Sequence, residues 1–80
     1  IMVGRYEKGA DMLYKVRFIK NSELSGVPYV FEETELEISD EAAARAAYEA
    51  AKPSAPDEAL RIDLVCGEGF TWEKVAEDAL

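Results

Sequence analysis

Two segments in the first half of the chain alternate between apolar and polar residues with the period of two that is typical of β-strands. The first, M-L-Y-K-V-R-F-I-K, covers residues 12–20, and the second, V-P-Y-V-F-E-E-T-E-L-E-I, covers residues 27–38. The intervening residues are turn formers, among them Gly26, which can adopt a positive φ, and Pro28, which marks the entry to the second strand. The pattern therefore predicts a β-hairpin.

Charged residues on the two strands predict the register of this hairpin. In one antiparallel register Lys15 lies opposite Glu35 and Arg17 lies opposite Glu33, and opposite charges across a strand pair contribute about 0.2–1 kcal/mol each. A shift of one residue would move every side chain to the other face of the sheet. The same register gives three further pairs: Tyr14–Leu36, Val16–Thr34 and Phe18–Glu32.

This register assigns the strand residues to two faces. The expected core face holds Tyr14, Val16, Phe18, Val30, Thr34, Leu36 and Ile38. Glu32 is the one acidic residue on this face, and it is expected near an edge. The expected outer face holds four apolar residues between charged ones: Leu13, Ile19, Tyr29 and Phe31. Aromatic residues flanked by charge are typical of a recognition patch or a dimer contact. Scattered, half-exposed strand residues would give the same pattern.

The rest of the chain predicts four further elements. Residues 1–7, I-M-V-G-R-Y-E, fit another strand. Residues 39–52, S-D-E-A-A-A-R-A-A-Y-E-A-A-K, predict a helix that is capped by Ser39 or Asp40 and ends before P-S-A-P. Residues 59–66, A-L-R-I-D-L-V-C, alternate again, with one apolar face formed by Leu60, Ile62, Leu64 and Cys66. Residues 70–80 predict a short C-terminal helix because apolar residues recur at helical spacing: Trp72, Val75, Ala76 and Ala79.

These elements predict one α+β domain over residues 1–80, with the order βββαβα. We expect a twisted antiparallel sheet of three to four strands, with the alanine-rich helix on one face and the short C-terminal helix beside it. The alanine-rich helix contains seven alanines, and Tyr48 is its only large apolar residue. Its small side chains favour close packing on a sheet face that carries the bulky residues.

Acidic residues outnumber basic residues by 17 to 9, which gives a net charge of −8. Residues 1–31 hold five basic and three acidic residues, whereas residues 32–80 hold four basic and fourteen acidic residues. Such a charge distribution argues against direct binding to nucleic acid or to an anionic membrane, and it favours a basic protein partner. An acidic surface that serves only solubility is the simpler alternative.

The sequence carries no recognisable catalytic, cofactor or metal signature. There is no histidine, so Ser–His and Cys–His arrangements are excluded, and Cys66 at the end of an apolar strand is expected to be a buried, inert thiol. C-G-E-G-F-T lacks the Lys-Ser/Thr of a phosphate-binding loop and is expected to form a turn from a strand to a helix. The acidic residues show no calcium-loop spacing. We therefore expect a protein that is not an enzyme.

The acidic series E-E-T-E-L-E-I-S-D-E, residues 32–41, suggests a sharper hypothesis. Alternate carboxylates on a strand lie roughly 6.6–7 Å apart, which is similar to the spacing of phosphates along a nucleic-acid strand. In size and charge the chain is similar to phage-encoded anti-CRISPR proteins and other acidic DNA-mimic inhibitors, a likeness that implies a basic, nucleic-acid-binding partner. The candidate partner-binding residues are Glu32, Glu33, Glu35, Glu37, Asp40, Glu41, Tyr29 and Phe31.

Two further expectations follow from the sequence. The alternative to an acidic inhibitor or adaptor is a structural or housekeeping domain that forms a homodimer through the apolar outer face of the sheet. The single cysteine excludes an internal disulfide and no apolar run is long enough to span a membrane, so a cytoplasmic location is expected.

Overall fold

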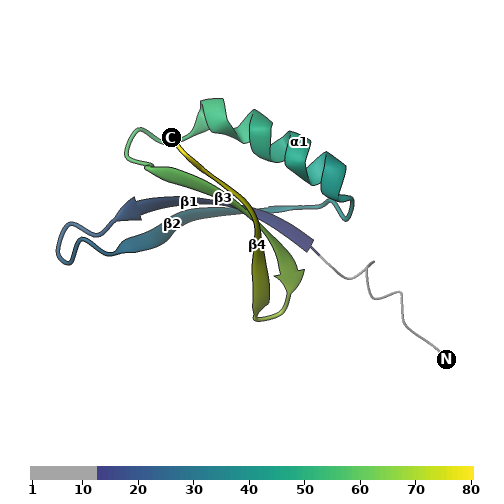
Figure 1. Cartoon of the computed structure of the whole chain (residues 1–80), viewed down its shortest axis with the longest axis horizontal. Helices are drawn as coiled ribbons and strands as arrows, with labels where there is room; N and C mark the ends of the chain where they lie inside the picture. The colour runs from purple at the N-terminus through teal and green to yellow at the C-terminus, as the bar shows by residue number, and fades with distance from the viewer. Residues whose placement is uncertain (1–12) are drawn as a thin grey trace.

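The computed structural model describes residues 13–80, which form a four-stranded antiparallel sheet with one helix on one face (Figure 1). The strands have the order β2-β1-β3-β4. The elements are β1 (Leu13–Asn21), β2 (Pro28–Leu36), α1 (Glu41–Ala51), a short 3₁₀ turn (Lys52–Ser54), β3 (Arg61–Glu68) and β4 (Thr71–Ala79). The expected α+β class is therefore confirmed. The strand predicted over residues 1–7 lies outside the described residues.

The predicted C-terminal helix is wrong, because these residues form strand β4, which pairs with β3. The register between β3 and β4 shifts between Leu64 and Val65, so that Val75 is an extra residue, a β-bulge, in β4. A bulge places two consecutive residues on one face and interrupts the period of two. Val75 and Ala76 both pack against the core, and this local break produced the helix-like spacing of apolar residues in the sequence.

The register predicted for the first hairpin is confirmed for the five pairs from Tyr14–Leu36 to Phe18–Glu32. It then shifts between Phe18 and Ile19, because Phe31 is an extra residue in β2. Beyond this bulge Ile19 pairs with Val30 and Lys20 pairs with Tyr29, so the two β2 residues exchange faces relative to the prediction. The expectation of Val30 on the core face and of Tyr29 and Phe31 on the outer face is therefore wrong.

The core lies between α1 and the two central strands. Ala44 and Tyr48 of α1 are buried against apolar residues of β1 and β3, which include Val16, Ile62 and Leu64. The bulge residue Phe31 packs against this cluster and is half-buried. The expected cap is present, since the Ala43 backbone N–H donates a hydrogen bond of 2.9 Å to Asp40 Oδ2.

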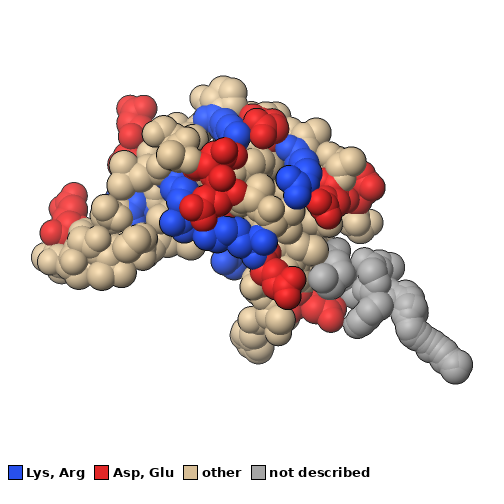
Figure 2. All heavy atoms as spheres, in the orientation of Figure 1, with Lys and Arg blue, Asp and Glu red and all other residues tan. Residues whose placement is uncertain are grey.

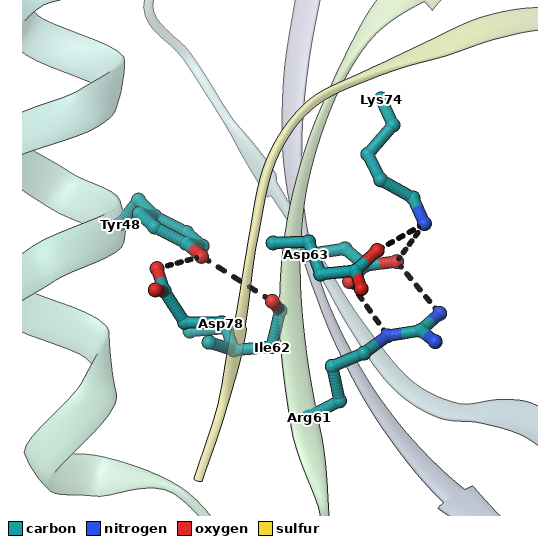
Figure 3. Close-up of polar contacts among 7 residues, drawn as sticks. Tyr48, Arg61, Ile62, Asp63, Lys74 and Asp78 are labelled. Carbon is teal, nitrogen blue, oxygen red and sulfur yellow. Dashed lines mark hydrogen bonds and ion pairs between the residues drawn. The ribbon is translucent and has the colours of Figure 1, made fainter.

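Tyr48 also joins the helix to the edge strand β4 (Figure 3). Its hydroxyl donates a hydrogen bond of 2.6 Å to Asp78 Oδ2 and lies 3.3 Å from the carbonyl oxygen of Ile62. Lys52 Nζ lies 2.9 Å from the same carboxylate oxygen of Asp78. The hydrogen bond from Tyr48, followed by that from Lys52, holds the pKa of Asp78 below its ordinary value of 3.8. Burial and the Asp78 carboxylate raise the pKa of Tyr48 above its ordinary value.

We expect Asp78→Asn to reduce the loss of stability in acid. The folded state lowers the pKa of Asp78, so its contribution is fully present above pH 3.8 and is lost as the pH falls through the folded value below that. The measurement is the melting temperature between about pH 5 and pH 2, where the curve of the variant should fall less steeply than that of the wild type. Asp57→Asn is the control, because Asp57 forms no ion pair with any described residue. An unchanged slope for Asp78→Asn would contradict the prediction.

Candidate functional site

The acidic strip, defined as Glu32, Glu33, Glu35, Glu37, Asp40 and Glu41, follows the edge strand β2 and continues to the first turn of α1. All six residues are exposed, and no residue of β2 is fully buried. Glu35 faces Lys15 across the sheet and Glu32 faces the core residue Phe18, so these two carboxylates lie on opposite faces. Strand β2 ends at Leu36, so Glu37 lies in the connection to α1. The strip therefore wraps around an edge and does not form a ladder on one face.

Three members of the acidic strip are held by contacts within the chain. Glu33 accepts hydrogen bonds from Lys15 Nζ at 3.0 Å and from Arg17 Nε at 2.7 Å, and these cations, Lys15 first, lower the pKa of Glu33. Asp40 caps α1, and Glu41 pairs with Arg45 Nε at 2.8 Å.

The other three carboxylates of the strip, those of Glu32, Glu35 and Glu37, form no ion pair or hydrogen bond with any residue in the described range 13–80. Because these acids are exposed and uncompensated, they provide the negative charge that the strip can offer to a partner.

The outer face of the sheet carries a network of paired charges (Figure 2, Figure 3). Of the four apolar residues expected there, Leu13 and Ile19 lie on this face and Ile19 is buried, whereas Tyr29 and Phe31 do not. Asp63 lies on this face and is only 4 % exposed. Its Oδ1 accepts a hydrogen bond of 2.9 Å from Arg61 Nε, and its Oδ2 accepts one of 3.1 Å from Arg61 Nη2. Lys74 Nζ lies 3.8 Å from Asp63 Oδ2. Lys15 Nζ lies 4.2 Å from the centre of the Trp72 ring, and the Arg17 guanidinium lies 6.0 Å from it. The cations of the described chain are therefore concentrated where carboxylates neutralise them.

A groove lies between the β1–β2 hairpin and the residues that precede β3. This hairpin groove has a volume of about 600 Å³ and is lined by Lys20, Asn21, Ser22, Glu23, Ser25, Val27, Tyr29, Glu58 and Leu60. Its apolar residues are substantially exposed: Val27 at 57 %, Tyr29 at 44 % and Leu60 at 53 %. Tyr29 is the one predicted site residue that lines the groove.

Sequence reasoning missed the hairpin groove, because Leu60 was expected on the core face with Ile62 and Leu64. In the structure Leu60 precedes β3, and its backbone N–H donates a hydrogen bond of 2.8 Å to the Ile19 carbonyl. Its own carbonyl accepts a hydrogen bond of 3.0 Å from the Leu80 N–H. These bonds fix Leu60 beside the hairpin with its side chain half exposed to solvent.

The remaining sequence candidates do not converge on a chemical site. C-G-E-G-F-T forms the hairpin between β3 and β4, where Gly69 has a φ of 58° at the first position of a two-residue turn. Cys66 is a half-buried free thiol. Within residues 13–80, no group of His, Cys, Asp and Glu is arranged to hold a metal ion, and no helix is long and apolar enough to cross a membrane.

No protein-family model, no curated protein and no solved structure matches this chain. The charges and contacts of the chain itself are therefore the basis for assigning its function.

Proposed function

We propose that this chain is a non-enzymatic protein-binding module, an acidic inhibitor or adaptor that docks on a basic surface of a partner protein. Surfaces that bind nucleic acid are basic, so a partner of that kind fits the negative charge of the acidic strip, although the strip does not reproduce the spacing of phosphates along one face. The observation that carries the proposal is the set of exposed, uncompensated carboxylates at Glu32, Glu35 and Glu37. A cytoplasmic location, expected from the single cysteine, belongs to the same proposal.

The distribution of charge supports this function. In the described chain the cations of the outer face are neutralised by Glu33, Asp63 and Glu77. The other acids of β2 and of the connection to α1, which are Glu32, Glu35 and Glu37, lack such partners within the described residues. A carboxylate without an internal partner gives up no existing ion pair when a basic residue of another protein approaches it. Acidic residues on an edge strand also discourage edge-to-edge association, but Glu37 lies beyond the end of β2 and does not protect that edge.

The test compares two double variants that remove the same amount of charge. Glu35→Gln with Glu37→Gln alters the acidic strip, whereas Asp57→Asn with Glu73→Gln alters exposed acids elsewhere that form no ion pair with any described residue. The probe is a labelled peptide of alternating Lys and Arg residues, and its binding is measured by fluorescence anisotropy. We expect the strip variant to bind about fivefold more weakly at low salt and the control to change by less than about twofold, because close charge pairs each contribute up to about 1 kcal/mol.

Salt provides the second readout of this experiment. Binding of the wild type should weaken between about 20 mM and about 200 mM salt, since exposed charges are screened over that range. Affinity that is independent of salt would contradict electrostatic docking. An equal loss of affinity in both double variants would show that only the net charge matters and that the acidic strip is not the binding surface.

A further inference from the structure

Exposed apolar side chains gather at one end of the molecule, around the β1–β2 hairpin. Of the large apolar residues that are exposed in the described chain, Phe70 alone lies elsewhere, at the tip of the β3–β4 hairpin. The others are Leu24, Val27, Tyr29, Val30, Leu60 and Leu80. Leu60 and Leu80 reach this end through backbone hydrogen bonds: the Leu60 N–H donates to the Ile19 carbonyl of β1, and the Leu80 N–H donates to the Leu60 carbonyl. Such a concentration of exposed apolar surface is typical of an interaction site.

The hairpin groove lies within this apolar end and has the size of a binding site for a short segment. Its volume of about 600 Å³ falls in the range of pockets that enclose a small ligand or a few side chains. Val27 and Tyr29 come from the hairpin, and Leu60 comes from the segment before β3. No residue of α1 lines the groove, so the helix does not cover it.

The charges at the groove specify what kind of segment can occupy it. Lys20 is the only cation among the lining residues, and it is already engaged, with Nζ 4.0 Å from Glu58 and 4.9 Å from the centre of the Phe31 ring. Glu23 also lines the groove, and it forms no ion pair with any described residue. Figure 2 shows that acidic side chains project from this end of the molecule. An occupant with Lys or Arg beside an apolar residue is complementary to this arrangement.

We infer that the hairpin groove binds a basic segment of the partner protein by taking up an apolar anchor residue between Val27, Tyr29 and Leu60. This inference rests on the proposed function and names a second contact for the same partner. Strand β2 connects the two surfaces, because Tyr29 lies near its start and Glu35 lies roughly 20 Å further along it. A second copy of this chain is a poorer occupant, since each copy carries a net charge of −8.

The test uses three short peptides that separate charge from the apolar anchor: KRLWRK, KRGSRK and EELWEE. Binding to the isotope-labelled 80-residue chain is followed by NMR chemical-shift changes and by calorimetry. We expect KRLWRK to bind at least about tenfold more tightly than the other two peptides, because a buried aromatic or aliphatic anchor dominates such contacts. Its shift changes should be largest at Val27, Tyr29 and Leu60, and this map is obtained on the wild-type protein.

Leu60→Ser is the test variant and Phe70→Ser is the matched control, since both side chains are exposed and apolar and lie in different regions. We expect Leu60→Ser to weaken KRLWRK binding about tenfold and Phe70→Ser to leave it unchanged.

Equal affinity for KRLWRK and KRGSRK, with shifts at Glu35 and Glu37 only, would overturn the groove inference and leave the acidic strip as the site. Equal affinity for EELWEE would overturn the basic character of the occupant. Self-association of the wild type that Leu60→Ser abolishes would identify a second copy as the occupant and also overturn the inference. Failure of both basic peptides to bind would count against the proposed function itself.

Discussion

Tyr48→Ala should lower the free energy of unfolding by about 3–5 kcal/mol, as expected for truncation of a buried aromatic residue. Tyr48 is 2 % exposed and is the only bulky residue by which α1 holds the sheet, since the other buried residue of the helix is Ala44. Alanine neighbours cannot move to fill the cavity that the ring would leave. A chain of this length has a total stability of only about 4–12 kcal/mol, so the variant should be partly unfolded at moderate temperature. The measurement is urea unfolding followed by circular dichroism.

Tyr48→Phe separates the packing of the ring from the hydrogen bond of the hydroxyl. This variant keeps the ring and leaves Asp78 with Lys52 as its remaining partner, so we expect a loss of only about 1 kcal/mol. Similar losses in Tyr48→Phe and Tyr48→Ala would mean that the hydroxyl, and not the ring, holds the helix on the sheet. A loss below about 1 kcal/mol for Tyr48→Ala would show that the helix does not depend on this anchor.

The sequence was sufficient for the first hairpin because two constraints agreed there. Opposite charges at Lys15, Arg17 and their β2 partners and the alternation of apolar residues both required the same register, and the observed pairs follow it as far as Phe18–Glu32. The alternation of apolar and polar residues cannot reveal the bulge that follows, because the residue that forms a bulge is of the same type as the other residues of the strand. Phe31 therefore joins the core and Tyr29 moves toward the groove, which no pattern of period two could indicate.

The same device explains the error at the C-terminus. Val75 and Ala76 share the core face of a bulged strand, which gave apolar spacing at three and four residues and so a helical reading. A signal for the hairpin was present, since Gly69 and Phe70 between two apolar segments fit a two-residue turn.

Whether a residue belongs to a candidate site depends on where the tertiary fold places it. The neutralisation of Glu33 could be anticipated from its cross-strand partner, but the groove depends on where the loop before β3 returns to the hairpin.

Gly67→Ala should destabilise the protein by about 2 kcal/mol or more, because it inserts an atom where the backbone of the neighbouring strand already lies. A Cβ at Gly67 would lie 1.9 Å from the Thr71 carbonyl oxygen and 2.8 Å from the Trp72 Cα. Both of these atoms belong to the backbone, so no side-chain rotation relieves the clash, and the β3–β4 hairpin itself must shift. The measurement is the free energy of unfolding, with the cross-strand amide signals of Gly67 and Trp72 as a local readout of the shift.

Gly69→Ala is the control in the same hairpin. A Cβ at Gly69 meets no atom within 4 Å, so its cost comes only from the φ of 58° and should be about 1–2 kcal/mol. The two variants therefore separate a steric cost from a conformational one. We expect Gly67→Ala to move the amide signals of β4 beyond the turn and Gly69→Ala to affect the turn alone. If Gly67→Ala is as stable as the wild type and leaves the signal of Trp72 unchanged, the close approach of β4 to β3 at this position is wrong, and with it the reason for a glycine there.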